Sequence, residues 1–388
     1  MRTELCDRFG IDVPIFAFSH CRDVVAAVSK AGGFGVLGAV AFSPEQLEIE
    51  LKWIDEHVDG KPYGVDIVMP AKYEGKDAGL GKADESGDVD ASVFEKMISP
   101  EHKAWIESVL EEYKVPKLPD HLESGFGSLL GWTDGGGRNA VDVALRHPVK
   151  LLVNALGPPP KDIIDVAHAH GIQVAALVGT VQHALRQKAQ GVDVIIAQGT
   201  EAGGHTGEIG SMVLLPDVVD AMGDTPVLGA GGIASGRQAA AALALGAQGV
   251  WTGSVWLGVE ESDMIPEVKK KFYAADSRDA VRSRSLSGKP ARMLRTAWTE
   301  AWESEQCPGF LPMPLQYMAC ADANSRIMHY ARNPESRAVE LLGMPVGQVV
   351  SRMKEEKKSA EVVLDFMQEF VETVERLQGT LEAAERRG

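Results

Sequence analysis

The chain has 388 residues, of which 45% are hydrophobic, and its formal net charge is −16. This length and apolar content are sufficient for one large domain or two ordinary ones, each with a sizeable core. The acidic balance disfavours a nucleic-acid partner, because no basic stripe is present to neutralise phosphate groups.

The cysteines and the first residues of the chain indicate a cytoplasmic protein. Cys6, Cys21, Cys307 and Cys320 are scattered, with neither the spacing of a metal site nor that of a disulfide framework. Such cysteines are typical of a reducing compartment. The first residues lack the apolar core of a signal peptide, and no apolar run is long enough to cross a membrane. We therefore expect a cytoplasmic location, no bound metal and no membrane contact.

Short apolar runs alternate with amphipathic helical stretches along most of the chain. The predicted strands cover residues 14–18, 34–37, 63–69, 150–154, 173–178, 192–197, 226–229 and 249–252. The predicted helices between them cover residues 22–31, 44–57, 161–170, 181–190, 211–222 and 235–245. Buried strands that alternate with helices form parallel sheets, and eight such strands point to a closed (β/α)8 barrel, the TIM barrel.

One segment interrupts this alternation. Residues 70–148 form an insertion after the third predicted strand, with a helical stretch at 100–113. Loops after barrel strands lie at the face where active sites form, so the insertion is a candidate lid or substrate wall. A peripheral decoration is an equal alternative. The barrel would comprise residues 1–69 and 149–263.

The remainder, residues 264–388, is predicted to be a mainly helical C-terminal extension. Its end, residues 359–387, has apolar spacing suited to packing on the barrel or on another subunit. A homodimer is therefore one interpretation of this extension.

Two glycine turns predict a phosphate-binding site at one end of the barrel. The stretch Gly229-Ala-Gly-Gly-Ile-Ala-Ser-Gly236 follows the seventh predicted strand and begins a helix, and Gly253-Ser254 follows the eighth. Backbone amides at a helix N-terminus bind anions, and barrel enzymes commonly hold a phosphate at these two loops. The alternative is a tight strand-to-helix turn without a ligand.

The first of these turns also matches the pattern G-x-G-x-x-A of a dinucleotide-binding fold. That fold requires an acidic residue at the end of the next strand, to bind a ribose. Here the next strand, within residues 249–254, carries no carboxylate. We therefore interpret the turn as a site for a mononucleotide phosphate.

The loop Gln198-Gly-Thr-Glu-Ala-Gly-Gly-His-Thr-Gly207 places His205 just past a buried strand. Glycines let a backbone approach a flat ligand closely, and an imidazole can move a proton near neutral pH. A flexible turn with a solvated histidine would be the better interpretation of a lone Gly-Gly-His. The phosphate turns favour a catalytic histidine.

Three stretches resemble the nitronate monooxygenase family, formerly called 2-nitropropane dioxygenases, and the related FMN-dependent enoyl-thioester reductases. They are the His205 loop, the stretch Gly231-Gly-Ile-Ala-Ser-Gly-Arg-Gln238, and Gly253-Ser254. The opening, with Phe9-Gly-Ile11 and Ala31-Gly-Gly-Phe-Gly35, is also similar to the family. The resemblance covers most of the barrel, and it implies FMN as the cofactor and an oxidoreductase activity.

The resemblance also implies roles for individual residues. His205 matches the family's catalytic histidine, which removes a proton from the carbon next to a nitro group. Gln198 and Gly203 match contacts to the flavin, while Gly232 and residues 251–254 match contacts to the FMN phosphate. The implied cofactor-binding residues are Ala17, Phe18, Asp66, Gln198, Gly203, Gly204, Gly231, Gly232, Thr252, Gly253 and Ser254.

Two positions depart from the family pattern. Many members have a Pro-Met pair near the flavin, where this chain has Ala17-Phe-Ser-His-Cys21. The third strand commonly ends Gly-Val-Asn, with an amide that contacts the cofactor, where this chain has Gly64-Val-Asp66. A carboxylate near the flavin disfavours the anionic reduced ring unless it is protonated or turned away. With the long insertion, these departures favour a substrate larger than a small nitroalkane.

Three further residues are candidates for substrate contact. Ser19 and His20 end the first strand at the barrel mouth, and Asn154 ends the fourth. His20 is a candidate second acid or base, although a capping or packing role is the stronger alternative, and strand-end asparagines often satisfy turns. Arg292 is interpreted mainly as a structural ion-pair residue that could also approach an acidic substrate such as a CoA thioester.

The leading interpretation is an FMN-dependent oxidoreductase, nitronate monooxygenase-like, in which His205 deprotonates an activated carbon that the flavin then oxidises. The alternative is an NAD(P)H-dependent reductase or dehydrogenase of an enoyl- or acyl-CoA-type thioester with a bulky acyl group. A flavin-binding sensor or carrier without turnover is a third interpretation, which a histidine at the ligand face disfavours. For a histidine base we expect one ionisation near neutral pH.

Overall fold

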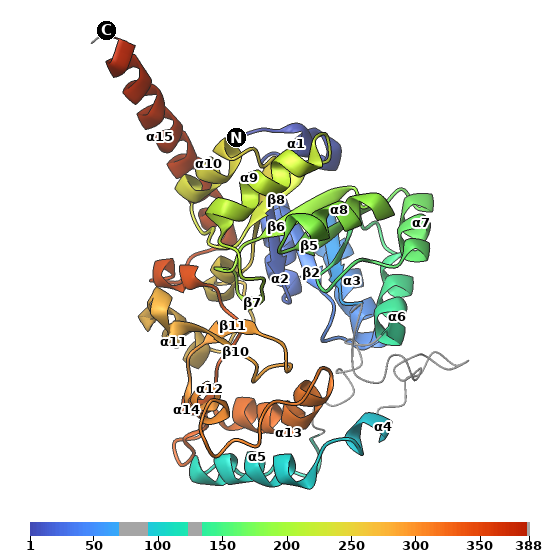
Figure 1. Cartoon of the computed structure of the whole chain (residues 1–388), viewed down its shortest axis with the longest axis vertical. Coiled ribbons are helices and arrows are strands. Elements are labelled where there is room, and N and C mark those ends of the chain that lie inside the picture. Colours follow the sequence, from blue (N-terminus) through green and yellow to red (C-terminus); the bar gives the residue numbers. More distant parts are fainter. Residues whose placement is uncertain (70–91, 123–133, 386–388) are drawn as a thin grey trace.

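The fold is built on a closed barrel of parallel strands, seen in a computed structural model that describes residues 1–69, 92–122 and 134–385 (Figure 1). The eight strands are β1 (Ile15–Ser19), β2 (Phe34–Gly38), β3 (Tyr63–Ile67), β4 (Leu151–Asn154), β5 (Gln173–Val178), β6 (Val194–Gln198), β8 (Val227–Ala230) and β9 (Gly249–Thr252). Each is hydrogen-bonded to the next, and β9 pairs with β1. Every strand overlaps a predicted one, so the predicted (β/α)8 barrel is confirmed.

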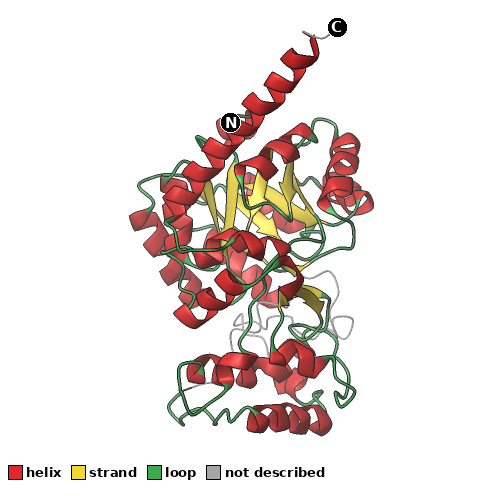
Figure 2. Cartoon of the chain, turned by 90° about the vertical axis from the view of Figure 1, so that its left-hand side faces the viewer, coloured by secondary structure: helices red, strands yellow, loops and turns green. Residues whose placement is uncertain are grey.

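Helices cover the outside of this barrel (Figure 2). They are α2 (Arg22–Lys30), α3 (Pro44–His57), α6 (Asp134–Ala144), α7 (Lys161–Ala169), α8 (Val181–Gln190), α9 (Ser211–Met222) and α10 (Gly236–Ala244). Local signals set their ends. The Ser43 hydroxyl caps α3 by accepting from the backbone N–H of Gln46 at 3.2 Å, and α8 ends at Gly191, whose φ is 96°.

Side chains along each strand alternate between the barrel interior and the layer under the helices. Phe16 faces the interior, where its ring meets Phe9 of α1 (Glu4–Phe9) edge-on at 5.4 Å and so closes the N-terminal end. Ala17 and Val65 pack in the outer layer. Because this alternation continues to the strand ends, the last inward residue of each strand faces the C-terminal mouth.

Part of the predicted insertion lies in the barrel. α6 packs against α3, and its Val141, Val143 and Ala144 are buried in the outer layer of the barrel core. It therefore takes the place of the helix that follows β3. We place the end of the insertion near residue 133 and not at 148, while residues 70–91 and 123–133 lie outside the described residues.

A second, helical lobe lies on the mouth side of the barrel (Figures 1 and 2). Its helices are α4 (Ser92–Glu95), α5 (Pro100–Glu112), α11 (Pro266–Ala274), α12 (Ala297–Trp302), α13 (Leu315–Tyr330) and α14 (Ala338–Leu341). Trp105 of α5 meets Trp302 of α12 with ring centroids 4.5 Å apart. Arg326 of α13 donates to the carbonyls of Val115 and Pro116, at 2.9 and 2.8 Å. The insertion and the C-terminal extension therefore share one core.

A small antiparallel sheet lies between the barrel and the lobe (Figure 1). Its strands, in spatial order, are β10 (Ala280–Ser283), β11 (Ala291–Leu294) and β7 (Gly204–His205). β7 belongs to the loop after β6, whereas β10 and β11 belong to the extension. The extension is therefore paired directly with the predicted catalytic loop.

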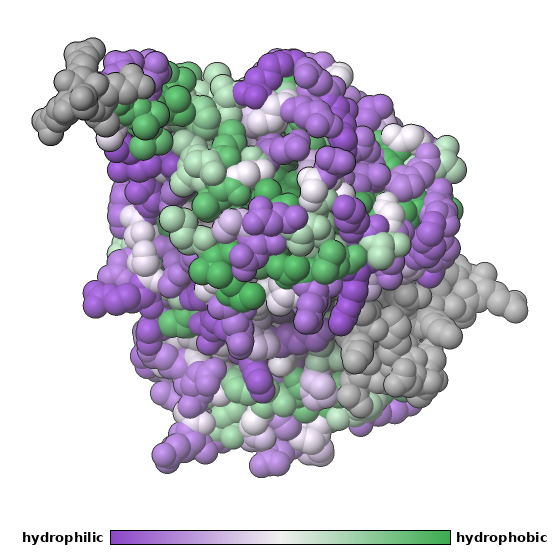
Figure 3. Space-filling view, turned by 45° about the horizontal axis from the view of Figure 1, so that its top comes forward, coloured by the Kyte–Doolittle hydropathy of each residue, from purple (hydrophilic) through white to green (hydrophobic). Residues whose placement is uncertain are grey.

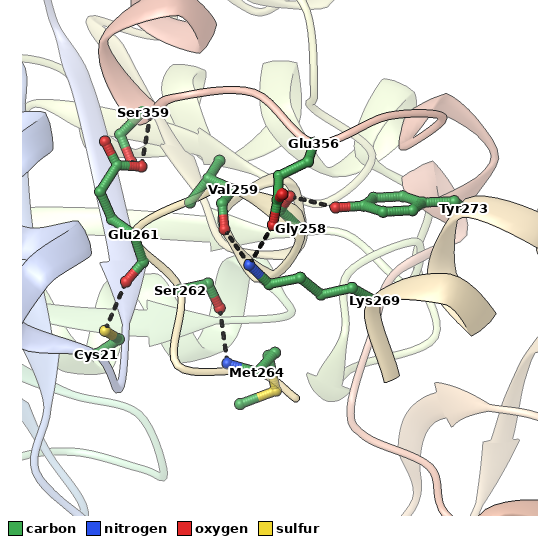
Figure 4. Close-up of polar contacts among 10 residues, drawn as sticks. All are labelled: Cys21, Gly258, Val259, Glu261, Ser262, Met264, Lys269, Tyr273, Glu356 and Ser359. Carbon is green, nitrogen blue, oxygen red and sulfur yellow. Dashed lines mark hydrogen bonds and ion pairs between the residues drawn. The ribbon is translucent and has the colours of Figure 1, made fainter. Parts of the chain in front are cut away.

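Polar contacts tie the extension to the segment that follows β9 (Figure 4). Lys269 Nζ donates to the carbonyl of Val259 and to the Glu356 carboxylate, each at 2.7 Å. The Glu261 carboxylate accepts from the backbone N–H and the hydroxyl of Ser359, each at 2.9 Å. A carboxylate at a helix N-terminus is favourable, so this contact fixes the start of α15 (Ser359–Glu385).

The first half of α15 packs on α10, and its second half projects beyond the barrel (Figures 1 and 2). A Cβ at Gly236 of α10 would lie 2.1 Å from the carbonyl oxygen of Phe366, so only glycine permits this approach. Apolar side chains are exposed along the projecting half of α15 (Figure 3), namely Val371, Val374, Leu377 and Leu381. The homodimer predicted from the sequence stays a prediction. Among the described helices, none is both long and apolar enough to span a membrane.

We predict that Trp302→Ala destabilises the lobe by about 3–5 kcal/mol, because it leaves a large cavity among buried aromatic side chains. Trp302 is 1% exposed. Urea unfolding followed by tryptophan fluorescence measures the change. Trp53→Ala, at a half-buried site on α3, is the control and should cost less. Equal losses in the two variants would contradict a shared core around Trp302.

Candidate active site

The mouth of the barrel gathers the last inward side chains of several strands. Phe18 of β1, Asp66 of β3, Gln198 of β6 and Trp251 of β9 face inward, because their neighbours along each strand pack in the outer layer. The rings of Phe18 and Trp251 lie 6.1 Å apart. The mouth is therefore an apolar surface with one carboxyl group and one amide group in it.

Asp66 is the acidic member of this group. Its side chain is 3% exposed, and among the described residues its Oδ1 has no hydrogen-bond partner. Burial raises the pKa of the Asp66 carboxyl well above its ordinary value, because the charged form loses its hydration. Buried polar atoms without partners are rare in folded proteins, so this oxygen marks a place where a ligand can bind.

The turn after β8 has the geometry expected of a phosphate cradle. Gly231 and Gly232 have φ values of 87° and 73°, which glycine adopts without strain. A Cβ at Gly231 would lie 2.8 Å from the carbonyl oxygen of Gly199. Gln238 holds the turn, since its Oε1 accepts from the backbone N–H of Ala234 at 2.9 Å and its amide donates to the carbonyl of Gly232. The backbone amides of the turn lead into the N-terminus of α10, where anions are favoured.

Gly253 and Ser254 lie beside the same mouth. The nearest atom to a Cβ at Gly253 would be a ring carbon of Phe18, at 3.8 Å. The Ser254 hydroxyl accepts from the backbone N–H of Gly347 at 2.8 Å, and its own hydrogen can still donate to a ligand. Gly347 in turn lies against Gly203, so the extension connects this turn with the His205 loop.

His205 lies in β7, opposite Ala291 of β11. Its Nε2 is 2.6 Å from the hydroxyl oxygen of Ser287, with the donor set by the ring tautomer. Burial, with a smaller effect of the Lys289 charge, lowers the pKa of His205 to about 4. The expected ionisation near neutral pH is therefore wrong for this histidine. The ring is neutral at physiological pH and can accept a proton.

Arg292 fixes the glycine-rich loop that carries His205. Its Nε donates to the carbonyl of Thr200 at 2.9 Å, and its Nη1 donates to the carbonyl of Ala280 at 2.7 Å. The interpretation of Arg292 as an ion-pair residue is therefore wrong, because its partners are backbone carbonyls. Gly204, the residue opposite Arg292 in the small sheet, has a φ of 75° and is the point where the loop turns into β7.

Four predicted site residues direct their side chains away from the mouth. Ala17 packs in the outer layer. The Ser19 hydroxyl accepts from the backbone N–H of Cys21 at 3.1 Å. The Thr252 hydroxyl donates to a backbone carbonyl at 3.1 Å and accepts from an indole at 2.9 Å. The Asn154 amide bonds the backbone of Met69, after β3, and of Gly157, after β4, through contacts of 2.9 to 3.3 Å.

His20, in contrast, borders the mouth. Its ring meets Phe18 edge-on at 5.1 Å, and its Nδ1 is 2.8 Å from the carbonyl oxygen of Gly38. Solvent reaches its side chain. It therefore remains a candidate for substrate contact.

Sequence reasoning missed two residues beside His205. Ser287 is fully buried and is bonded to the imidazole, and Lys289 is half-buried next to it. Both flank Gly288 in the stretch that contains Arg292. The signal that could have found them is the small sheet, which places this stretch beside His205.

The fold is a (β/α)8 barrel with glycine-containing turns after its last two strands, where barrel enzymes commonly bind a phosphate group. The family model described as nitronate monooxygenase matches residues 9–369. The chain therefore belongs to the nitronate monooxygenase family, and it is a flavin-dependent oxidoreductase.

Individual relatives agree with this assignment. A Mycobacterium tuberculosis protein, named provisionally as a monooxygenase, is 53% identical over 98% of this chain and 100% of its own length. A Bacillus subtilis protein, named provisionally as a nitronate monooxygenase, is 30% identical over 81% of this chain and 85% of its own.

Solved structures agree as well. FabK from Thermotoga maritima has a TM-score of 0.70 and 27% identity, over 98% of this chain and 99% of that one. Nitroalkane oxidase from Streptomyces ansochromogenes has a TM-score of 0.74 and 24% identity, over 96% and 99% of the two chains, and shows the same fold.

We predict that Gly231→Ala weakens FMN binding at least tenfold. A side chain at positive φ costs about 1–2 kcal/mol, and the added Cβ would also displace the backbone of Gly199. Gly171→Ala is the control, because Gly171 has a φ of 70° but open space around its Cβ position. Quenching of flavin fluorescence gives both dissociation constants. Unchanged binding in Gly231→Ala would exclude this turn as the phosphate site.

Proposed function

We propose that this protein is an FMN-dependent oxidoreductase, nitronate monooxygenase-like, with His205 as its general base. The observation that carries the proposal is a neutral imidazole held beside the barrel mouth by a dedicated strand pairing. A general base must be unprotonated and fixed in place, and His205 meets both conditions.

FMN fits the residues at the mouth. The backbone amides of Gly231, Gly232, Gly253 and Ser254 would bind its phosphate. Gly231 lies so close to Gly199 that no side chain fits there, so its backbone stays accessible to a ligand. The unpartnered oxygen of Asp66 offers a polar contact for the ring. Bound FMN supplies a ring that accepts two electrons or a hydride.

In the proposed reaction His205 takes a proton from the carbon next to an electron-withdrawing group. The C–H bond breaks and its electron pair stays on the carbon. Bound FMN would accept two electrons from that carbon, and molecular oxygen would be the final electron acceptor. The Ser287 hydroxyl orients the ring through its 2.6 Å contact with Nε2. The Lys289 ammonium, next to His205, would stabilise the anion that forms.

A second candidate is an NAD(P)H-dependent reductase or dehydrogenase of an enoyl- or acyl-CoA-type thioester. It is supported by the similarity to FabK over nearly the whole chain and by a helical lobe on the mouth side, which could border a bulky acyl group. Both reactions move a proton and two electrons at adjacent positions, so one site could serve either.

One experiment separates these candidates. The purified holoprotein is mixed without oxygen with NADPH or with a nitronate, and loss of the flavin absorbance band is followed. An enoyl-CoA, which is an electron acceptor, is then added to the reduced protein and should restore the band if the second candidate is correct. Fastest bleaching by the nitronate supports the first candidate, and fastest bleaching by NADPH supports the second. If no reagent bleaches the band, both candidates fail and a protein without turnover remains.

We predict that His205→Asn keeps its FMN but lowers kcat by roughly two to four powers of ten, the range for loss of a general base. In the wild type, kcat/KM should rise with pH through an ionisation near the pKa of His205, about 4, and stay level from neutral pH upward, because only the unprotonated ring accepts a proton. The variant should lack this rise. His183→Asn, at an exposed position on α8, is the control and should keep the turnover of the wild type. Near-normal turnover in His205→Asn would exclude His205 as the base.

A further inference from the structure

The carboxyl group of Asp66 is a buried polar group at the mouth that takes no part in the proposed proton transfer. It faces inward at the end of β3, opposite Gly38 of the neighbouring strand β2, and its Oδ1 lacks a partner among the described residues. The backbone of Asp66 is fully engaged in the barrel, where its carbonyl accepts from the N–H of Ala39 at 2.8 Å. Among the described residues, no hydrogen bond to Oδ1 explains why this carboxyl group is buried here.

The elements packed against Asp66 offer it no charge. Its register partners are Gly38 of β2 and Val153 of β4, which are both uncharged. The titratable group beside Gly38 is His20, and the pKa of His20 is lowered because protein atoms surround the ring, although the mouth leaves it open to solvent. This shift favours the neutral form of the His20 ring. Among the described residues, no cation lowers the pKa of Asp66.

An ionised carboxylate at position 66 would be buried without a positive charge beside it in the described part of the chain. Loss of hydration disfavours the charged form strongly, and the neutral acid is the form that such a site retains. A neutral carboxyl group has one O–H donor, as an asparagine side chain has its N–H donors. A protonated aspartic acid can thus do at this position what a neutral amide would do.

We propose that Asp66 is a protonated carboxylic acid that donates a hydrogen bond to the FMN ring, so that binding of FMN is linked to one proton. This inference rests on the proposed function for the identity of the ligand. Its consequence concerns binding and not turnover: the protein holds FMN tightly while Asp66 is neutral, and more weakly once Asp66 loses its proton.

The test is the dissociation constant of FMN as a function of pH, for the wild type and for Asp66→Asn. Between pH 5 and 9 the wild-type constant should rise, by up to about tenfold per pH unit above the pKa of Asp66 in the free protein. The constant of Asp66→Asn should match that of the wild type within about threefold at pH 5, because both side chains are neutral donors. At pH 9 the variant should bind FMN at least tenfold more tightly than the wild type.

Titration of the FMN phosphate itself affects both proteins equally and cancels in the comparison. Asp165→Asn, at an exposed position on α7 that pairs with Lys161, is the matched control and should follow the wild-type curve. Parallel curves for the wild type and Asp66→Asn would overturn the proposal for Asp66 while FMN binding stands. Absence of FMN binding in all three proteins would instead overturn the proposed function.

A second measurement needs no variant at position 66. The infrared spectrum of the FMN-bound wild type at pH 7 should contain the C=O stretch of a protonated carboxyl group. A spectrum with carboxylate bands alone would overturn the proposal.

Discussion

The backbone pairing between His205 and Ala291 is the contact on which the candidate site depends. The loop after β6 is rich in glycine, and glycine gives a chain many conformations. Pairing with β11, supported by the bonds from Arg292 to two backbone carbonyls, selects one of them. The glycine turn after β8, in contrast, is held by Gln238 of α10, within the barrel. The turn after β8 and the loop that carries His205 are therefore held in place by different parts of the molecule.

The barrel and the glycine turns after its last two strands could be predicted from the sequence because their signals are local. A buried parallel strand reads as a short apolar run, and the helices between strands carry their own periodicity. Gly231 and Gly232 stand where a phosphate loop requires positive φ, and the structure gives them that φ. The sequence does not show which side chains face inward at the strand ends. It therefore predicts Ser19 and Asn154 at the mouth, although their side chains do not face it.

The surroundings of His205 could not be predicted because they depend on contacts between distant segments. Ser287 and Lys289 lie more than 80 residues after His205, and only the small sheet brings them together. The pKa of His205 follows from that burial, so an ordinary value was expected where a low one is found. The shared core of the insertion and the extension could not be predicted for the same reason. Trp105 and Trp302 are distant in the chain, and no sequence signal pairs them.

The division of the lobe between two distant segments has a consequence for synthesis of the chain. The apolar face of α5 is buried only when α13 and its neighbours pack against it; its residues are Ile106, Val109 and Leu110. At about 5–20 residues per second on the ribosome, α5 emerges roughly 10–40 s before α13 does. During that interval its apolar face is exposed to chaperones and to other nascent chains. The barrel strands are complete before the lobe can close, so a newly made molecule can gather its cofactor before it has a positioned imidazole.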